Sequence, residues 1–300
     1  MTPKAKRDFL RVADLSGDEL RQLLDHATAM KNQRRHGGQR RSLEGRSVAL
    51  IFEKSSTRTR VSFEVGAFEL GAHPVVLNSR DMQLGRGESI EDTARTLSRY
   101  VHAIVLRTAG HDRVEALAAA ASVPVINALT DDHHPCQILA DLLTVRERRG
   151  SLEGLRYAWI GDANNVARSW VEAAERLGLA LTVASPEGYG FKARELPANV
   201  WQVVDPREAA RGADVVITDV WASMGQEGDA EVRRAAFAGY QVNAALLADS
   251  NPGAMVLHCL PAHRGEEIDA GLLDGPDAVV WDEAENRLHA QKALLEFLMR

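Results

Sequence analysis

The sequence contains little cysteine and no cysteine pattern that would hold a small fold together. Cys136 and Cys259 are the only two in 300 residues, and they form neither a CxxC pair nor the Cys/His spacing of a zinc site. This excludes a disulfide framework and indicates a reducing compartment, so we expect a cytoplasmic protein. No metal-ligand cluster stands out, and no metal or other cofactor is expected.

Long apolar runs and an excess of positive charge are also missing. No stretch approaches the roughly 18 apolar residues of a membrane helix, and no apolar signal region follows Lys4, Lys6 and Arg7. The 36 basic and 42 acidic residues give a net charge of −6. We therefore expect neither a membrane nor a nucleic-acid partner, whereas a small anion would need only a local basic pocket.

Basic residues gather between positions 31 and 41, around Gly37 and Gly38, with no aromatic residue among them. This composition is typical of a solvated loop, and an RNA or anion patch is the alternative.

The chain is long enough for two domains, and its 45% hydrophobic residues can build two cores. A capping box of Ser16 and Glu19 predicts a first helix. Short apolar runs then alternate with helical stretches, so we expect strands at residues 47–52, 73–77, 103–106, 123–127, 157–160, 181–184, 215–218, 255–258 and 279–281. This pattern predicts an α/β fold of two domains, each a mostly parallel sheet covered by helices on both faces.

The helix expected at residues 135–149 has a proline in its first turn and Gly150 after its end. It stands where a two-domain chain should cross over. We therefore place the domains at residues 1–147 and 148–283.

Ligands of parallel α/β sheets bind beyond the carboxyl ends of the strands. The segment at 53–60, Glu-Lys-Ser-Ser-Thr-Arg-Thr-Arg, follows an expected strand and opens a helix. Its hydroxyls, guanidinium groups and free backbone N–H groups suit an anion with several oxygens. Neither GxGxxG nor GxxxxGK[ST] lies near it, which argues against a nucleotide cradle. An ordinary helix cap with a solvated basic face is the alternative.

Further polar side chains follow strands of the first half. Arg107 comes directly after the strand at 103–106, and Pro135 begins a helix with His134 at its cap and Gln137 on the same face. These groups could reach one ligand at the helix mouth, or His134 could only cap the helix. His133 is expected to be exposed.

Three segments of the second half carry similar groups. Residues 161–165, Gly-Asp-Ala-Asn-Asn, are similar to a Rossmann turn without its second and third glycines. Residues 219–225, Asp-Val-Trp-Ala-Ser-Met-Gly, could bind an ammonium and a carboxylate or act as a lid. In the segment 258–261, His-Cys-Leu-Pro, Cys259 is either a small buried hydrophobe or a partner for a reacting amine.

In this order and spacing, the segments 56–60, 134–137, 219–225 and 258–261 closely resemble the aspartate/ornithine carbamoyltransferase family. The likeness covers roughly residues 8–299 and includes Gln83 and Arg287. The Ser-Met-Gly loop and the His-Cys-Leu-Pro segment resemble the ornithine branch, because the aspartate branch generally carries His-Pro-Leu-Pro at the second place.

The resemblance implies that the first domain binds carbamoyl phosphate and that a C-terminal helix at about residues 284–300 packs back on it. The implied contacts are Ser56, Thr57, Arg58, Thr59, Arg107, His134, Gln137 and Arg287, with Cys259 and Leu260 near the reacting group and Gln83 from a neighbouring subunit. A homotrimer with shared active sites, or a higher assembly of trimers, is implied as well.

The second domain would bind L-ornithine. The implied contacts are Asn165, Asp219, Ser223 and Met224, and a cis bond would precede Pro261. The δ-amine would attack the carbamoyl carbon, and phosphate would leave to give L-citrulline. Arg58, Arg107 and His134 would stabilise the developing charge, and Cys259 would position the amine and accept its proton. Such an amine is similar to that of lysine, whose ordinary pKa is about 10.4, and is therefore protonated at pH 7.

Other interpretations stay open. The acceptor could be N-acetylornithine, putrescine or aspartate, although the loop at 223–225 favours ornithine. A non-catalytic anion sensor or a nucleotide-dependent oxidoreductase could share the same layers. The missing GxGxxG argues against the oxidoreductase, and the polar groups on both domains argue against the sensor. The sequence does not fix the physiological direction of the reaction.

Overall fold

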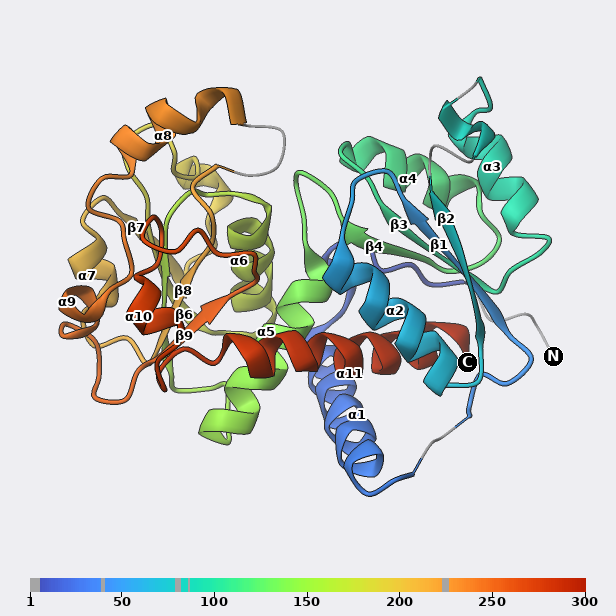
Figure 1. The fold of residues 1–300 in the computed structure, drawn as a ribbon, viewed down its shortest axis with the longest axis horizontal. Helices are drawn as coiled ribbons and strands as arrows, with labels where there is room; N and C mark the ends of the chain where they lie inside the picture. The colour runs from blue at the N-terminus through green and yellow to red at the C-terminus, as the bar shows by residue number, and fades with distance from the viewer. Residues whose placement is uncertain (1–5, 39–40, 79–81, 86, 223–226) are drawn as a thin grey trace. The chain divides into compact units, whose positions relative to one another are not determined.

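The computed structural model describes residues 6–38, 41–78, 82–85, 87–222 and 227–300. Their contacts divide the chain into unit 1, residues 1–143 with 285–300, and unit 2, residues 144–284. Each unit is a parallel sheet with helices packed against it (Figure 1). In the part of the chain that the structure describes, every helix is too short or too polar to cross a membrane.

Unit 1 contains a four-stranded parallel sheet with the order β2-β1-β3-β4. Its strands are β1 (Ser47–Phe52), β2 (His73–Asn78), β3 (Ala103–Arg107) and β4 (Val125–Leu129). Its helices are α1 (Gly17–Arg35), α2 (Thr57–Glu69), α3 (Ile90–Leu97) and α4 (His111–Ala120), with 3-10 turns η1 (Val12–Asp14) and η3 (Gln83–Gly85). Helices α5 (Pro135–Arg149) and α11 (Val280–Met299) cross the division between the units.

The sheet of unit 1 is covered on both faces, as predicted. Strand β3 is buried along its whole length, and strand β1 at all but its first residue. Apolar side chains of α3 and α4, including Ala94, Val114 and Leu117, pack on one face, while α2 and α11 lie on the other (Figure 1). The edge strand β2 is only half buried.

Unit 2 contains a five-stranded parallel sheet with the order β7-β6-β5-β8-β9. Its strands are β5 (Arg156–Ile160), β6 (Ala180–Ala184), β7 (Val200–Val203), β8 (Val215–Thr218) and β9 (Met255–His258). Its helices are α6 (Asn165–Leu177), α7 (Pro206–Ala210), α8 (Ala230–Ala236), α9 (Ala244–Leu247) and α10 (Ala270–Leu273), with 3-10 turns η4 (Ala193–Glu195) and η5 (Glu227–Asp229).

Both faces of this sheet are again covered. Phe237 and Val242 belong to an apolar cluster with the strand residue Val216 on one face. On the other, Trp170 of α6 packs against Tyr157 of β5, with ring centroids 5.5 Å apart. The fold class predicted from the alternating apolar runs is therefore confirmed.

The expected first helix is present and longer than its apolar pattern suggests. The Ser16 side chain accepts the N–H of Glu19, and the Glu19 carboxylate accepts the N–H of Ser16, which confirms the capping box. The helix continues to Arg35, so the first half of the basic stretch is helical rather than a loop. Lys31 is only 2% exposed, and its ammonium donates to Asn286 Oδ1 at 2.7 Å, which offsets the cost of burying the charge.

Two strand predictions are wrong. The run at 279–281 is not a strand, because α11 begins at Val280 and only Ala278 forms an isolated bridge to Val256. Strand β7 is not among the expected strands, because it lies at the sheet edge and its Trp201 side chain is 52% exposed, so it lacks a continuous apolar run. Strand β4 begins at Val125 rather than at residue 123.

The strand orders determine where each unit can bind a ligand. In unit 1 the chain leaves β1 toward β2 and returns to β3 on the other side of β1; in unit 2 it leaves β5 toward β6 and returns to β8. Loops on opposite sides of such a reversal diverge and leave a crevice at the carboxyl ends of the two strands. Binding groups are therefore expected after β1 and β3, and after β5 and β8.

Candidate active site

The start of α2 is the predicted anion-binding end of unit 1. Ser56 is the N-cap, and its hydroxyl oxygen accepts the N–H of Thr59 at 3.2 Å. Thr57 and Arg58 lie in the first helical turn, where the backbone N–H groups point out of the helix start. The ordinary helix cap, which was the alternative interpretation of this segment, is thus present. It does not block the helix start, which can still bind an anion.

Three further side chains predicted from the sequence lie close to this helix start. Arg107 ends β3, paired in register with Phe52, and is 8% exposed. His134 precedes α5, and its carbonyl accepts the N–H of Gln137 at 3.1 Å. His134 and Gln137 are both buried.

Arg287 of α11 joins two of these groups. Its guanidinium donates to Gln137 Oε1 at 2.6 Å and to Thr59 Oγ1 at 3.1 Å. Gln137 and Thr59 lie at the starts of α5 and α2, so residues up to 228 positions apart meet at one place. The structure therefore brings the predicted anion-site residues of unit 1 together.

This concentration of positive charge acts on His134. Burial and the neighbouring Arg287, Arg107 and Arg58, in that order, hold the pKa of its imidazole well below the usual value. The ring is therefore neutral near pH 7. A neutral imidazole between arginines can donate one hydrogen bond to an oxyanion without adding charge.

Asp219 is the centre of the corresponding region in unit 2. It follows β8 and is 7% exposed. Its Oδ2 accepts from Asn164 Nδ2 at 2.7 Å, and its Oδ1 accepts from Cys259 Sγ at 3.1 Å. A carboxylate, an amide and a thiol thus meet after β5, β8 and β9.

The segment that carries Cys259 is held by buried polar groups. The His258 backbone N–H donates to Glu283 at 2.9 Å, and its Nδ1 accepts the N–H of Leu260 at 2.9 Å. Its Nε2 lies 3.0 Å from Glu267 Oε1. Leu260 has a φ of 57°, and the expected cis bond before Pro261 is present.

The remaining predicted site residues are less informative. Gln83 lies in η3 and is exposed, and Asn165 is the first residue of α6. Ser223 and Met224 lie outside the described residues. His133 is buried rather than exposed, because its N–H donates to Thr130 and its ring packs on His111 at 4.6 Å.

Sequence reasoning missed three residues around these sites. Asn164 caps α6, accepting the N–H groups of Val166 and Ala167, while also donating to Asp219. Asp141 accepts from Gln137 Nε2 at 2.8 Å. For Asp141 the available signal was its spacing of four residues after Gln137 on a helix. Asn164 lies in the segment 161–165 that the sequence singles out, but its contact with Asp219 was not indicated, and nothing local indicated Glu267.

Two groups of described side chains could in principle hold a metal ion, contrary to the expectation that no such cluster exists. They are Asp219 with His258 and Cys259, and His263 with Glu266 and Glu267; in each, the ligand atoms lie within 4.8 Å of one another. In the first group both nitrogens of His258 are already hydrogen-bonded, to Leu260 and Glu267. In the second, Glu266 is paired with Arg234 at 3.0 Å. A metal ion would have to displace these bonds.

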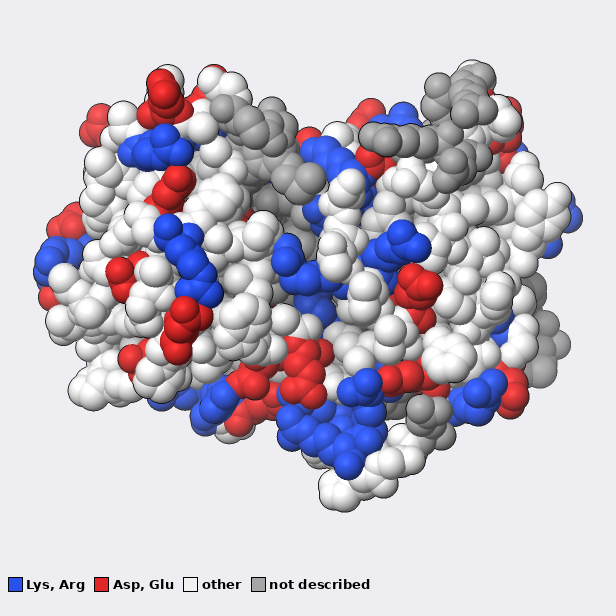
Figure 2. Space-filling model, in the orientation of Figure 1, with Lys and Arg blue, Asp and Glu red and all other residues white. Residues whose placement is uncertain are grey.

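The basic stretch at 31–41 does not resemble an anion site in its described part. Figure 2 shows Lys and Arg over the C-terminal half of α1, with acidic side chains beside them. Arg34 pairs with Glu69 at 2.8 Å, and Arg35 with Glu285 at 3.6 Å. Both arginines thus have a carboxylate partner, although Glu69 also pairs with Lys292 and Glu285 with Lys31.

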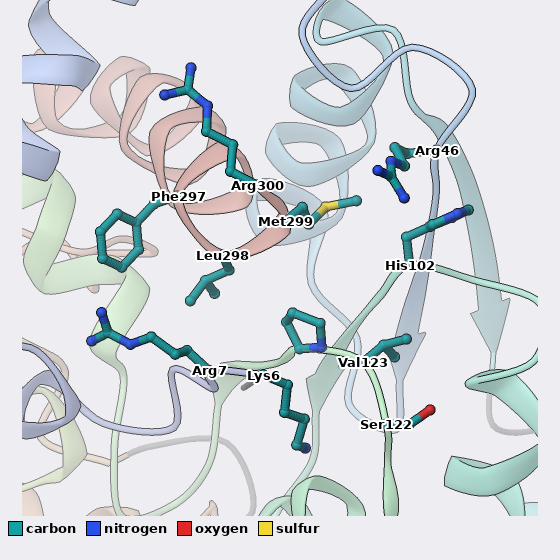
Figure 3. A pocket seen from close by; sticks show the side chains of 11 residues that line it. Lys6, Arg7, Arg46, His102, Ser122, Val123, Phe297, Leu298, Met299 and Arg300 are labelled. Carbon is teal, nitrogen blue, oxygen red and sulfur yellow. The ribbon is translucent and has the colours of Figure 1, made fainter. Parts of the chain in front are cut away.

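A cavity of about 240 Å³ lies elsewhere in unit 1 (Figure 3). Its wall includes Arg46, His102 and Val123, which precede β1, β3 and β4, together with the end of α11. It is therefore at the amino edge of the sheet, opposite to Arg107 and His134. Lys6 and Arg7 in its wall are already paired with Asp8 and Glu19.

Known proteins share both the sequence and the fold of this chain. The family model of the aspartate/ornithine carbamoyltransferase carbamoyl-P binding domain matches residues 7–147, and that of the Asp/Orn binding domain matches residues 153–298. Ornithine carbamoyltransferases of Acidothermus cellulolyticus and Halorhodospira halophila are 57% and 54% identical to it, with 98% of this chain and 96% and 99% of theirs covered. The structure of the Pyrococcus furiosus ornithine carbamoyltransferase superposes with a TM-score of 0.94 at 48% identity, covering 98% of this chain and 97% of the other. The chain therefore belongs to the aspartate/ornithine carbamoyltransferase family.

Proposed function

We propose that this protein transfers the carbamoyl group of carbamoyl phosphate to the δ-amine of L-ornithine, giving L-citrulline and phosphate. One observation carries the proposal on the structural side: Arg287 links Thr59 and Gln137 beside a neutral His134. The similarity to ornithine carbamoyltransferases over 98% of the chain supports it.

Unit 1 binds carbamoyl phosphate in this proposal, and residues 1–147 with the helix at 284–300 form its domain. The start of α2, with Ser56, Thr57, Arg58 and Thr59, receives the phosphate. Arg107 and His134 donate to the carbamoyl oxygen, and Gln137 contacts the carbamoyl amino group. Helix N-termini and guanidinium groups suit a phosphate dianion because both present several donors.

Unit 2 binds ornithine, within a domain of residues 148–283. Asp219 receives the α-ammonium, and Asn165, Ser223 and Met224 complete the amino-acid site. Cys259 and the carbonyl of Leu260 face the δ-amine. Asn164 and Cys259 fix the buried Asp219 carboxylate, and this supports the role, because each carboxylate oxygen has a second lone pair that can accept from an ammonium group.

The reaction is an acyl transfer. The neutral δ-nitrogen attacks the carbamoyl carbon, an oxyanion forms, and the C–O bond to phosphate breaks with its electron pair leaving on phosphate. Cys259 Sγ takes up the nitrogen's proton and passes a proton on to the departing phosphate, while Asp219 Oδ1 holds the thiol in place at 3.1 Å. Arg58, Arg107 and His134 stabilise charge that grows on the carbonyl oxygen and on phosphate. A reactive thiol supports a reducing, cytoplasmic location.

The proposed assembly is a homotrimer in which Gln83 completes the site of a neighbouring subunit; trimers could associate further. Exposed apolar side chains on unit 1 support a partner surface, since Val61 and Phe68 of α2 are 52% and 64% exposed. Inactive Gln83→Ala and Arg58→Ala chains should regain activity when mixed trimers form. A monomer in sedimentation, or no regain of activity, would overturn this part.

The decisive test of the reaction is citrulline formation from carbamoyl phosphate, with ornithine, N-acetylornithine, putrescine and aspartate assayed side by side near pH 8. Turnover with ornithine alone is expected. Turnover with another amine would support the assigned phosphate site but contradict the role assigned to Asp219. If no product forms with any of the four amines, a non-catalytic anion sensor is favoured.

A further inference from the structure

The side-chain amide of Gln137 is held in one orientation by partners of opposite character. Its Nε2 donates to Asp141 Oδ1 at 2.8 Å, and its Oε1 accepts from Arg287 at 2.6 Å. A carboxylate accepts and a guanidinium only donates, so the inverted amide would face an acceptor with its oxygen and a donor with its nitrogen. Gln137 and Asp141 are each 1% exposed, so water cannot relieve such a mismatch.

The geometry of α5 explains how Asp141 reaches Gln137. The two residues are four positions apart in Pro135–Arg149 and therefore lie on one face of the helix. His134 and Gln137 are at the helix start, and Asp141 lies one turn deeper. Asp141 can thus position Gln137 from one turn further along α5 without touching a ligand itself.

The orientation matters for the chemistry of the ligand. Carbamoyl phosphate carries an amino group where acetyl phosphate carries a methyl group, and the two are otherwise alike in size and charge. A carbonyl oxygen accepts a hydrogen bond from the amino group and gains nothing from the methyl. Because Gln137 Oε1 has two lone pairs, it can accept from Arg287 and from the ligand together.

We propose that Asp141 is a positioning residue that fixes Gln137 with its oxygen toward the acyl group, and that this makes the site select a carbamoyl over an acetyl group. The inference rests on the proposed function, because it assigns Gln137 to the carbamoyl amino group. Buried groups built to pair with a substrate N–H discriminate strongly against an analogue that lacks it, since they are then left unpaired.

The test compares three anions on the wild-type protein and on Asp141→Asn. The asparagine amide can donate as well as accept and carries no charge, so Gln137 keeps a fixed partner only on the Arg287 side and its orientation is held less firmly. Affinities for carbamoyl phosphate, acetyl phosphate and inorganic phosphate are measured by ligand-induced thermal stabilisation, and KM and kcat from citrulline formation. We expect carbamoyl phosphate to bind about tenfold or more weakly in the variant. Acetyl phosphate and inorganic phosphate should change less than about twofold, as should the KM for ornithine.

Glu69→Gln is the matched control. Glu69 is also a buried carboxylate of unit 1, 6% exposed and paired with Lys292 at 2.6 Å, but it lies at the far end of α2 from Ser56. It should lower the unfolding temperature without changing the preference for carbamoyl over acetyl phosphate.

If Asp141→Asn loses the same factor of affinity for all three anions, Asp141 has only a structural role and the inference is overturned. An unchanged preference of the variant for carbamoyl over acetyl phosphate would overturn the inference as well. If the variant does not fold, the wild-type protein still decides, because a site without at least a tenfold preference for carbamoyl over acetyl phosphate contradicts the proposal. Thermal stabilisation needs no ornithine, so a protein that selects carbamoyl phosphate but makes no citrulline would refute the proposed function and leave this inference standing.

Discussion

Cys259 donates a hydrogen bond from Sγ to Asp219 Oδ1 across 3.1 Å. The two side chains follow neighbouring strands, since Thr218 of β8 and His258 of β9 are paired in register. Asn164 holds the other carboxylate oxygen at 2.7 Å, so the carboxylate cannot turn away from the thiol. The Cys259 thiol and the Asp219 carboxylate therefore hold each other in place, and replacing either side chain should change the position of the other.

Replacing Asp219 by Asn should separate the two substrates. Loss of a buried carboxylate that receives an ammonium removes a charge-assisted hydrogen bond, so the KM for ornithine should rise about 10- to 100-fold. Binding of carbamoyl phosphate should be unchanged, because its proposed contacts lie in unit 1. Initial rates against each substrate measure both quantities.

Asp214 offers a matched control at the opposite end of the same strand. It accepts hydrogen bonds from the Arg156 N–H and from Asn251, before β8 begins. Asp214→Asn should leave both KM values near those of the wild type. If Asp219→Asn weakens the binding of both substrates equally, the assignment of one substrate to each unit is contradicted.

Arg58→Ala should lower kcat by about 10²-fold or more, because it removes one preorganised donor at the place where charge develops. Arg60→Ala is the control from the same segment. Arg60 is exposed and pairs with the exposed Glu64 at 3.5 Å, so its loss should change kcat less than about twofold. The idea fails if the two variants have similar rates.

The sequence predicts the elements whose residues are buried on both faces. Strand β3 begins with the uninterrupted apolar run 103–106, and its predicted and observed bounds differ only by Arg107 at its end. The run at 279–281 has the same appearance, yet Val280 begins a helix with Asp282 and Glu283 in its first turn. A short apolar run is compatible with either structure, and only the packing of the rest of the chain decides.

The same division applies to the site. Arg107 and His134 are predictable because each follows a strand, and the order of strands places such residues together. Asn164 and Lys31 are not, because their roles depend on Asp219 and Asn286, which are distant in the sequence. Lys31 has the sequence context of a solvated loop, and only its buried partner reveals its role.

The neutral state of His134 has a consequence for pH dependence. Burial and the neighbouring Arg287, Arg107 and Arg58 lower its pKa, so protonation occurs only well below pH 6.5 and the imidazole stays neutral from neutral pH upward. The acid limb of the kcat/KM profile should therefore come from other groups, such as the substrate amine. His134→Gln should lower kcat, while the midpoint of that limb stays within about 0.3 pH units. A limb that disappears or moves further in the variant would show that His134 titrates in the working range.

Acid stability should depend on the ion pair between Glu19 and Arg7. The Arg7 guanidinium lies 2.5 Å from the Glu19 carboxylate, and with the Ser16 N–H it lowers the pKa of Glu19 to about 2. Because the folded pKa lies below the ordinary value of 4.5, this contribution is complete above pH 4.5 and is lost as the pH falls toward 2. The pair is partly exposed, so Glu19→Gln should lower the unfolding temperature by only about 1–3 °C at pH 7.

Thermal unfolding followed by circular dichroism between pH 7 and pH 3 measures this difference. The gap between wild type and Glu19→Gln should narrow steadily below pH 4.5, because the wild-type carboxylate begins to take up a proton in the unfolded chain first. Asp18→Asn serves as the comparison, since Asp18 is 89% exposed at its side chain and pairs with Arg21 at 3.3 Å. It should change the unfolding temperature by less than about 1 °C at either pH. A Glu19→Gln gap that is the same at pH 7 and pH 3 would mean that the capping geometry, which glutamine preserves only in part, carries the effect rather than the charge.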